Sequence, residues 1–583
     1  MQQLTATIST NDFDCKTVGR LAFQIEAAGV HTSLLSNLKI DTTELLNVYK
    51  NDGIQEFLKN INEAIFIVND SNRKVLYFGV DAFAIKPIFY AKIQGNLLID
   101  SDLKSIVDRV KEGTLINNRK LSAYFNWNAD ELPADNETFY EGIFRLLPGQ
   151  IGCYENEKLN FLNSWKALGP LTKEDYADAF REQFEKSVLR ERNAIKLSAN
   201  LSGGLDSSAV TSVLATEKVV KTIYFDARTT ESDEKEYADE LSEKYQVEQI
   251  SVFPPGNLYH SLKEVTRAIS QPDPSVLPSF IHERIIYDAL KNGSEVLYSG
   301  HGGDSVVSYG YEYLDELLEA SDWSKFEKAC EQYDSFRHNE RSIAESLIKT
   351  KVKKAIKKRE LLKTAKLLFA GITRFGIKLP VHRKETQIRD YKYFENRILL
   401  KKASVTKSTK QFDSVSIAAN LSKYQKAHFD FNFIRLGING NEVLSLLGHQ
   451  KDIGVSFPFF EKKLLEIAVN TPNEIKFGSG YTRGLVRDAL KDYFPKKIKE
   501  RTTKADFTVF AFACFEKLYA NFRIEFGKDE KLWSIINQYV FEDLVSVVLS
   551  KDFTPKQKVK HTWLAMRVIN FGIWLSQQEL KDE

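Results

Sequence analysis

Cysteine is scarce in this chain, and the four that occur lie far apart. Cys15, Cys153, Cys330 and Cys514 form no C-x-x-C pair. A disulfide framework and a structural zinc site both need closely or regularly spaced cysteines. The sequence therefore argues against both, and it favours a reducing, cytoplasmic location in which the thiols are small buried hydrophobic groups.

The chain also has no long apolar run and no excess of either charge. No segment approaches the length of a membrane span. The first residues, MQQLTATISTNDFDCK, lack the basic and apolar segments of a signal peptide. Because 81 Lys and Arg stand against 79 Asp and Glu, overall charge indicates neither nucleic acid nor a membrane as partner. A chain of 583 residues is too long for one core, so at least two domains are expected.

The pattern of strand-like and helix-like segments changes along the sequence. As far as about residue 165, runs rich in Ile, Val, Phe and Tyr alternate with turn residues, which predicts antiparallel hairpins. From about Leu171, strand-like KTIYFDA and EVLYSG alternate with helical segments such as DEKEYADELSEKY. That alternation is typical of a parallel α/β sheet. After about residue 312 the pattern predicts mainly amphipathic helices.

One strand-like run ends in a glycine-rich turn that contains no lysine. Residues 197–210 read LSANLSGGLDSSAV. Such a turn at the start of a helix exposes backbone N–H groups to phosphate, but a Walker A loop would supply a lysine. Here Asp206 is present instead, and a carboxylate beside phosphate is favourable where Mg²⁺ bridges the two. The turn predicts a phosphate and Mg²⁺ site, and a plain helix cap is the alternative.

A second glycine-rich loop favours the phosphate site over the cap. Residues 298–311, YSGHGGDSVVSYGY, also follow a strand-like run and also carry one aspartate, Asp304. Loops at the carboxyl ends of parallel strands converge on one crevice. We therefore expect Asp206 and Asp304 to hold the same Mg²⁺. We expect His301 to be a hydrogen-bonding loop residue rather than a catalyst.

These loops resemble those of a known family. SGGLDSS is similar to the pyrophosphate loop (PP-loop) of the N-type ATP pyrophosphatases, and SGHGGDS resembles the second loop of their asparagine synthetase branch, usually SGxGGDE. DAFAIKPIFY and LLIDSDLKSIV resemble that branch's amino-terminal domain, and TFYEGIFRLLPGQ followed by Trp165 resembles its interdomain segment. FPFFEKKLLEIAVNTP and RTTKADF resemble its later motifs, RxPFLDxxLxExAxxxP and RxKxxF. Because these motifs occur in the same order over nearly the whole chain, the chain is identified as a member of the asparagine synthetase-like family.

The resemblance implies an α/β fold in two domains. Residues 1–168 would form an antiparallel β-sandwich with helices, of the Ntn-hydrolase type that glutamine amidotransferases use. Residues 169–583 would form a PP-loop domain, similar to the adenine nucleotide α-hydrolases, with a parallel sheet and a helical carboxyl-terminal part.

The resemblance also implies an AMP-forming carbon–nitrogen ligase with ATP and Mg²⁺ as cofactors. A substrate carboxylate would attack the α-phosphorus of ATP and displace pyrophosphate, and an amine would then attack the acyl-adenylate, forming an amide and releasing AMP. Lys504 and Asp206 would be catalytic, with Lys504 stabilising charged transition states. Asp206 and Asp304 would hold the metal. The residues expected to bind ATP and pyrophosphate are Leu201, Ser202, Gly203, Gly204, Leu205, Asp206, Ser207, Ser208, Phe225, Ser299, Gly300, Gly302 and Gly303.

The amino-terminal segment departs from the family pattern. Glutamine-hydrolysing members have cysteine directly after the initiator methionine, because the thiol attacks while its own free α-amino group acts as base. Here Gln2 follows Met1, and the nearest thiol is Cys15. The family's NGEIYN-like glutamine-binding segment is also missing. We therefore expect a degenerate amidotransferase-like domain and no glutaminase activity.

The second half departs as well. Ser305 replaces the Glu that usually follows Asp304, a change that bears on metal binding. Gly454, Ser456 and Glu461 stand where the family has Glu, Arg and Asp, changes expected to bear on the acceptor pocket. Together these departures favour an amine other than ammonia, as in the β-lactam-forming and lasso-peptide macrolactam branches. The substrate would be a small-molecule or peptide carboxylate, and a precursor peptide or a protease would be the partner.

Other functions stay open at this point. One is an ammonia-dependent asparagine synthetase that converts aspartate and ATP to asparagine, AMP and pyrophosphate. Another is a catalytically impaired pseudo-synthetase that acts as a binding partner. A tRNA-modifying PP-loop enzyme is a third, but the second loop and the near-neutral charge argue against it, so no nucleic acid partner is expected. The sequence does not indicate an oligomeric state.

A strongly basic segment lies outside all these motifs. Residues 349–366, KTKVKKAIKKRELLKTAK, predict one amphipathic helix with a partial apolar stripe. The stripe consists of Ile348, Val352, Ala355, Ile356 and Leu362. A solvated helix face is the plain interpretation, and binding of an acidic peptide, RNA or anionic lipid is the alternative.

Overall fold

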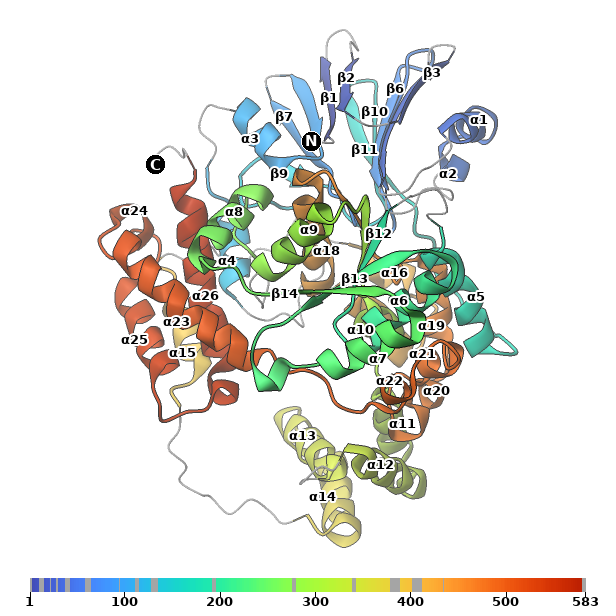
Figure 1. The fold of residues 1–583 in the computed structure, drawn as a ribbon. Coiled ribbons are helices and arrows are strands. Elements are labelled where there is room, and N and C mark those ends of the chain that lie inside the picture. The colour runs from blue at the N-terminus through green and yellow to red at the C-terminus, as the bar shows by residue number, and fades with distance from the viewer. Residues whose placement is uncertain are drawn as a thin grey trace.

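Two antiparallel sheets lie at one end of the protein, and a parallel sheet covered by helices lies in its middle (Figure 1). The structure is a computed structural model. It describes the backbone of residues 3–9, 15–20, 23–27, 30–36, 42–57, 64–93, 95–110, 115–126, 135–190, 196–274, 279–337, 342–377, 388–400, 412–433 and 435–578. Side chains are described from residue 47 onward, except at 337 and 435–439.

The amino-terminal part is built from two antiparallel sheets, with strand orders β2-β1-β8-β7-β9 and β11-β10-β6-β5-β4-β3. The expected hairpins β5–β6, β7–β8 and β10–β11 are confirmed. Alternate residues of β5, β6 and β8, such as Ile67, Phe78 and Ile99, fill the space between the sheets. The strands are β1 (Gln3–Ser9), β2 (Cys15–Arg20), β3 (Phe23–Ala27), β4 (Val30–Ser36), β5 (Ala64–Asp70), β6 (Val75–Val80), β7 (Phe89–Ile93), β8 (Asn96–Asp100), β9 (Ile143–Arg145), β10 (Gln150–Glu155) and β11 (Lys158–Asn163). The helices are α1 (Thr42–Asp52), α2 (Ile54–Phe57), α3 (Leu103–Val110) and α4 (Asn118–Phe125).

The central sheet is wholly parallel, with the order β14-β13-β12-β15-β16. Its strands are β12 (Leu197–Asn200), β13 (Val220–Phe225), β14 (Glu248–Val252), β15 (Val296–Tyr298) and β16 (Gly454–Ser456). Helices α6 (Leu205–Glu217) and α7 (Lys235–Tyr245) cover one face; α9 (Phe280–Lys291) and α18 (Arg435–Gln450) cover the other, and α8 (Leu258–Ile269) packs against these two helices (Figure 1). The strand order reverses between β12 and β15, and such a switch point opens a crevice at the carboxyl ends of the strands.

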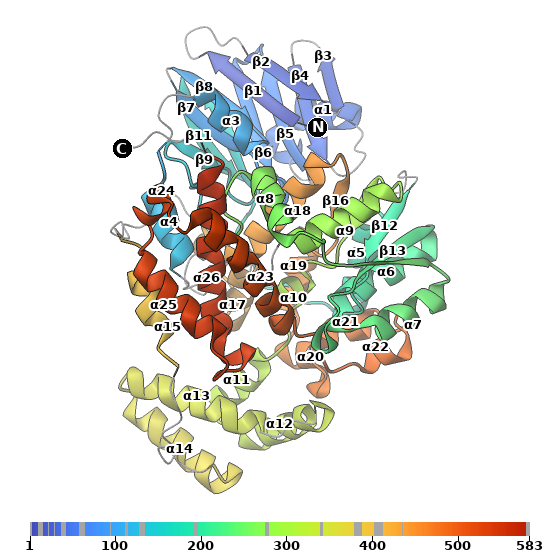
Figure 2. The same cartoon turned by 60° about the vertical axis from the view of Figure 1, so that its left-hand side comes forward.

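The remaining helices surround this sheet. Helices α23, α25 and α26 pack together beside it, and α12 to α14 lie at the end farthest from the amino-terminal sheets (Figure 2). Among the helices described, none has the length and apolarity to cross a membrane. The bounds are α5 (Tyr176–Val188), α10 (Gly303–Val307), α11 (Glu312–Ala320), α12 (Trp323–Arg337), α13 (Ile343–Lys357), α14 (Leu361–Phe375), α15 (Tyr391–Arg397), α16 (Ser414–Ile417), α17 (Lys423–Phe431), α19 (Lys462–Asn470), α20 (Asn473–Phe477), α21 (Gly484–Ala489), α22 (Lys496–Glu500), α23 (Thr508–Phe526), α24 (Glu530–Trp533), α25 (Gln538–Leu549) and α26 (Pro555–Ser576); η2 (Thr230–Ser232) and η3 (Gly478–Gly480) are short 3₁₀ turns.

An aromatic cluster joins the amino-terminal part to the rest of the chain. The Phe83 ring lies 5.8 Å from Trp165, 5.7 Å from Phe433 and 5.2 Å from Phe460, measured between centroids. The Arg145 guanidinium also donates to Glu442 on α18 at 2.6 Å, a buried ion pair across the same junction. The predicted fold class is confirmed, and the division at residues 168 and 169 stays a prediction.

The basic segment does not form the single helix that its sequence predicts. Helix α13 ends at Lys357 and α14 begins at Leu361. Between them Arg359 has φ +58°, a left-handed conformation that ends helices. Of the expected stripe, Ile348, Val352 and Ala355 are buried, whereas Ile356 and Leu362 are exposed. The prediction failed because the sequence gives no Gly or Pro to mark the turn.

Candidate active site

The first glycine-rich loop connects β12 to α6 at the switch point. Helix α6 starts directly after Gly204, so Asp206 lies in its first turn, where the positive end of the helix favours a carboxylate. Gly203 has φ +82°, and a Cβ at this position would lie 2.5 Å from the carbonyl oxygen of Glu234. Glycine is therefore required here both for its backbone conformation and for the close contact.

The second loop packs directly against the first turn of α6. A Cβ at Gly300 would lie 2.4 Å from the backbone nitrogen of Ser207, and a Cβ at Gly303 would lie 2.3 Å from the carboxyl carbon of Asp206. Only glycine allows this approach. The contact places Asp304, in the first turn of α10, next to Asp206. The two loops therefore meet as the sequence predicts.

One guanidinium bridges the two aspartates. Arg483 donates from Nη1 to Asp304 Oδ1 at 2.7 Å and to Asp206 Oδ2 at 3.2 Å, and from Nη2 to Asp206 Oδ1. Burial raises the pKa of Asp206, Arg483 opposes that rise, and the neighbouring Asp304 adds to it. Burial acts on the pKa of Asp304 in the same direction, but Arg483 and Lys504 outweigh it and hold that pKa below its usual value. Asp304 is therefore the more strongly ionised of the two.

The backbone around Arg483 is strained. Ser479, Thr482 and Arg483 have φ values of +52°, +64° and +57°, in the left-handed region that non-glycine residues rarely occupy. Each such residue costs of order 1–3 kcal/mol, and the cost persists where the surrounding structure imposes the conformation. The Arg483 side chain is 4% exposed. We infer that the strain is tolerated because it aims this guanidinium at the two loops.

Lys504 reaches one of these carboxylates, that of Asp304, from the opening of the cavity. Its Nζ donates to Asp304 Oδ2 at 2.6 Å and to Tyr309 Oη at 3.2 Å, and the Tyr309 hydroxyl donates to Asp304 Oδ1 at 2.7 Å. Partial desolvation lowers the pKa of Lys504, but the Asp304 carboxylate outweighs it and holds that pKa above its usual value. The side chain is 70% exposed, so this cation is accessible from solvent.

Arg501, three residues before Lys504, joins this segment to Glu234 by a buried ion pair and to the first loop by a hydrogen bond. Arg501 pairs with Glu234 and donates from Nη1 to the Gly203 carbonyl at 2.8 Å. Glu234 also accepts from the Ala505 backbone nitrogen at 2.9 Å. The Arg501 guanidinium lies 4.1 Å from the centre of the Tyr237 ring. This arrangement fixes Lys504 relative to the loop that holds Asp206.

These groups line a cavity of about 510 Å³, a volume within the usual range of ligand sites. Some of the residues predicted to form the site lie behind its wall instead: Ser208 is fully buried, and Phe225 packs against Phe510. The predicted residues that line the cavity are Ser202, Gly204, Leu205, Asp206, Ser207, Ser299, Gly300, Asp304 and Lys504. Those that do not are Leu201, Gly203, Ser208, Phe225, Gly302 and Gly303. The roles assigned to all of them stay predictions.

The donor set suits Mg²⁺ only together with a nucleotide. Within the described residues, no group of three or more His, Cys, Asp or Glu side chains is arranged to hold a metal ion. Asp206 and Asp304 provide two carboxylates that already share one cation, Arg483. Because Mg²⁺ commonly takes one or two carboxylates plus phosphate oxygens, these two residues fit a metal that arrives with ATP.

The positions that depart from the family pattern lie outside this cavity. The Ser305 hydroxyl donates back to the Gly302 carbonyl at 3.1 Å. Ser456 is buried at the end of β16, and its carbonyl accepts from Ser299 at 2.9 Å. Glu461 caps α19 by accepting from Leu464 at 3.0 Å. None of these three lines the cavity, and neither does Gly454. The structure therefore does not bring Gly454, Ser456 and Glu461 into it as an acceptor wall.

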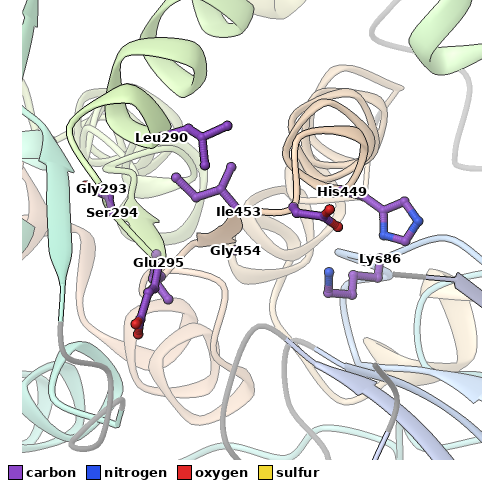
Figure 3. A pocket seen from close by; sticks show the side chains of 10 residues that line it. Lys86, Leu290, Gly293, Ser294, Glu295, His449, Ile453 and Gly454 are labelled. Carbon is purple, nitrogen blue, oxygen red and sulfur yellow. The ribbon is translucent and has the colours of Figure 1, made fainter. Parts of the chain in front are cut away.

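Gly454 lines a second cavity of about 410 Å³ at the opposite edge of the parallel sheet (Figure 3). Glu295 and Gly454 lie at the amino ends of β15 and β16, away from the aspartates. Lys86 from the amino-terminal part and His449 from α18 form another part of its wall (Figure 3). Burial, together with the charge of Lys86, lowers the pKa of His449 to about 3, so this imidazole is neutral.

Sequence reasoning missed three residues that organise the first cavity. Arg483, Glu234 and Tyr309 carry no motif of their own, and Arg483 lies 277 positions from Asp206. Tyr309 is within the stretch YSGHGGDSVVSYGY, only five positions after Asp304. Its placement just beyond a glycine-rich loop was the available signal. The His301 backbone N–H donates to Ser299 Oγ at 3.2 Å, and His301 lines the cavity, so its expected role as a loop residue rather than a catalyst stays a prediction.

Comparison with known proteins identifies the family. A sequence model of the asparagine synthase domain matches residues 179–576, and one of a glutamine amidotransferase domain matches residues 31–165. Glutamine-hydrolysing asparagine synthetase 1 of Bacillus subtilis is 23% identical over 480 residues, which cover 80% of this chain and 70% of that protein. Asparagine synthetase 3 of Bacillus subtilis is 26% identical over 180 residues, 30% of this chain and 29% of that protein. The amidase chyE of Penicillium rubens is 26% identical over 186 residues, 30% of this chain and 26% of that protein.

The first of these matches spans well over half of the chain, and it includes both glycine-rich loops, Arg483 and Lys504. The chain therefore belongs to the asparagine synthase family, and it is an ATP-dependent carbon–nitrogen ligase.

Proposed function

We propose that this ligase converts a carboxylate to an acyl-adenylate in the 510 Å³ cavity and joins it to an amine that enters the cavity directly, without glutamine hydrolysis of its own. The observation that carries the proposal is the convergence of Asp206, Asp304, Arg483 and Lys504 on one cavity at the switch point of the sheet. Such a fixed set of charges is what an adenylating enzyme needs around a transferring phosphoryl group.

Each group has a proposed task. The start of α6, with Ser202 and Ser207, would bind the pyrophosphate part of ATP. When bound through Asp206 and Asp304, Mg²⁺ would neutralise phosphate charge. Lys504, which is exposed at the cavity opening, would stabilise the charge that develops when the substrate carboxylate attacks the α-phosphorus and when the amine attacks the acyl carbon.

The proposed lack of glutaminase activity follows from the place of Cys15. This residue begins β2 and lies opposite Ile8 of β1 in an antiparallel ladder. Its backbone nitrogen is part of a peptide bond, so the thiol has no free α-amino group of its own to act as base. The other three cysteines are free thiols, two buried and one half-buried. Nitrogen would therefore come from an amine that reaches the cavity directly.

For the carboxylate we propose a peptide, as in lasso-type macrolactam formation. The opening of the cavity supports a large substrate, because the Asp304 and Lys504 side chains are 43% and 70% exposed there. A second candidate is ammonia-dependent asparagine synthesis. It is favoured by the relative that matches 80% of this chain and carries the name asparagine synthetase.

Exchange of labelled pyrophosphate into ATP tests the proposal and separates the candidates. The protein would be incubated with ATP, Mg²⁺ and either aspartate or Asp- and Glu-containing peptides, with Asp206→Asn as the inactive control. We expect peptide-dependent exchange in the wild type, loss of at least about 100-fold in Asp206→Asn, and no glutamate from glutamine. Exchange with aspartate, followed by asparagine formation from ammonia, would favour the second candidate. No exchange with any carboxylate would indicate a pseudo-synthetase.

A further inference from the structure

The hairpin formed by α13 and α14, residues 342–377, presents an apolar stripe to solvent. Along α14, Leu362, Phe369 and Ile372 are 88%, 71% and 49% exposed. These positions and Ala365 follow a spacing of three and four residues, so they lie on one face of the helix. At the turn, Leu361 and Ile356 extend the stripe with exposures of 81% and 58%.

This stripe is additional to the face by which α14 packs. Leu367, Ala370 and Gly371 are buried against α13, and a Cβ at Gly371 would lie 3.2 Å from the Ile348 side chain. A surface helix of a globular protein normally has one apolar face and one polar face. Helix α14 instead has two apolar faces, one used for packing and one exposed, and exposed apolar surface of this kind marks an interaction site.

The stripe is surrounded by positive charge. Residues 342–377 contain ten lysines and arginines but only two glutamates. Three of the lysines have carboxylate partners: Lys349 pairs with Glu345, Lys351 with Asp315 and Lys363 with Glu360. The remaining cations of the hairpin are Lys353, Lys354, Lys357, Lys358, Arg359, Lys366 and Arg374. Their charge complements an anionic surface.

The hairpin lies at the edge of the molecule. Both views place α14 outermost, with α13 between it and the body of the protein (Figures 1 and 2). The exposed stripe is on the side of α14 away from α13, so it projects outward. A projecting stripe fits a flat partner better than an extended peptide, which binds in a groove. A second copy of the chain would bring an equal positive charge against the first.

We propose that the α13–α14 hairpin docks this ligase on an anionic phospholipid membrane. Leu361, Leu362, Phe369 and Ile372 enter the boundary between headgroups and acyl chains, while the surrounding lysines and arginines contact lipid phosphates. Amphipathic helices of this composition lie in the plane of the interface in that manner, and clusters of Lys and Arg increase their affinity for anionic lipid. The attachment is peripheral, and it goes beyond the proposed ligase reaction.

Vesicle sedimentation tests this inference with the full-length protein. Vesicles of equal parts phosphatidylcholine and phosphatidylglycerol would be compared with vesicles of phosphatidylcholine alone. We expect the protein to sediment with the mixed vesicles only and to be released by high salt, because electrostatic attraction to the surface is screened. The double variant Leu362→Glu/Phe369→Glu should lower the partition coefficient at least about tenfold, and so should Lys357→Glu/Lys358→Glu.

Matched variants elsewhere control for unspecific effects. Ile524 and Val219 are at least about as exposed as the stripe residues, at 87% and 93%, but lie elsewhere, on α23 and just before β13. Ile524→Glu/Val219→Glu should therefore sediment like the wild type, as should Lys551→Glu/Lys186→Glu. Circular dichroism would verify that each variant is folded. Because no residue of the hairpin lines the cavity, pyrophosphate exchange without vesicles should be unchanged, which separates this inference from the ligase proposal.

Three results would overturn the inference. The first is equal sedimentation with both kinds of vesicle or with neither. The second is vesicle binding that Leu362→Glu/Phe369→Glu leaves unchanged. The third is hairpin-dependent binding to a fluorescent acidic peptide without any binding to vesicles, because that result would assign the surface to a peptide.

Discussion

Asp206 and Asp304 share the Arg483 guanidinium, and Asp304 also accepts from Lys504. The four charges balance before any ligand arrives. The two cations are in different surroundings, because the Arg483 side chain is 4% exposed and that of Lys504 is 70% exposed. Arg483 is therefore expected to matter for stability and Lys504 for the reaction.

Substitution of the two cations should separate these effects. Lys504→Ala should lower pyrophosphate exchange about 100- to 1,000-fold, as the loss of one fixed transition-state donor does, with a change in unfolding free energy below about 1 kcal/mol. Arg483→Gln should cost about 2–4 kcal/mol, somewhat less than a fully buried pair because Asp304 is partly exposed. Chemical denaturation and exchange assays measure both.

Lys497→Ala is the matched control, since this exposed lysine of α22 pairs only at the surface with Glu236, at 3.3 Å. It should leave both quantities unchanged. Wild-type exchange in Lys504→Ala would show that this lysine has no catalytic role.

At the level of single residues, the sequence predicted that Asp206 and Asp304 lie close together, but it did not predict the role of Arg483. The aspartates follow two strands of one parallel sheet, so their proximity follows from topology. Arg483 follows no strand, and its left-handed backbone is held by a distant segment, since its own N–H donates to the Tyr309 carbonyl at 3.4 Å. Such contacts have no local sequence signal.

Among the elements, α10 has a buried support beneath its carboxyl end. His428 Nε2 donates to the carbonyls of Val306 at 2.9 Å and Ser305 at 3.2 Å, and its Nδ1 accepts from Lys476 Nζ at 3.2 Å. Burial and the neighbouring Lys476 charge hold the pKa of His428 well below its usual value, so the ring is neutral. This chain joins α20 and α17 to the helix whose first turn holds Asp304.

The pH dependence of stability should reveal this support. Burial lowers the pKa of Lys476 to about 8 from 10.5. Between these values the unfolded chain binds more protons than the folded one, so stability rises with pH. The variant Lys476→Met has no titrating group at this position, so its stability lacks this rise with pH. The stability of the variant minus that of the wild type should therefore fall by about 3 kcal/mol between pH 8 and 10.5. Urea denaturation at several pH values measures it.

Lys463→Met, at an exposed position of α19, controls for the substitution itself. A constant difference between Lys476→Met and wild type across the range would mean that Lys476 stays charged when folded.

The sequence predicted elements well where periodicity and turn residues agree, as in the β5–β6 hairpin and α7. It was wrong for residues 349–366. Lysine-rich helix formers continue through the turn at Arg359, and the break depends on packing of α14 against α13. Tertiary contacts overrode local propensity there.

Across the whole molecule, the amino-terminal sheets support the second loop through one ring. Phe83 packs on Phe460, and Phe460 fills the space beside Gly302, where a Cβ would lie 2.4 Å from its ring. Phe460 also lies 5.9 Å from the His301 ring, between centroids. The amino-terminal part therefore contacts Phe460, the residue that packs directly against the loop that holds Asp304.

Removal of that ring should affect both stability and the reaction. Phe83→Ala should cost about 3–5 kcal/mol in unfolding free energy, and it should lower pyrophosphate exchange even where the variant is fully folded, because the second loop loses its support. Phe78→Ala, which removes a ring from the core between the two amino-terminal sheets, should cost about as much stability. Equal exchange rates in the two variants would contradict the link between Phe83 and the loop.

The aromatic cluster has a consequence for the history of this chain. A ligase whose amine does not come from glutamine has no chemical use for an amidotransferase half. Yet deletion of that half would strip Phe83 and Trp165 from Phe433 and Phe460, and so expose apolar rings beside the second loop. Under the proposed function, natural selection would keep the amino-terminal sheets for their shape after their chemistry has gone.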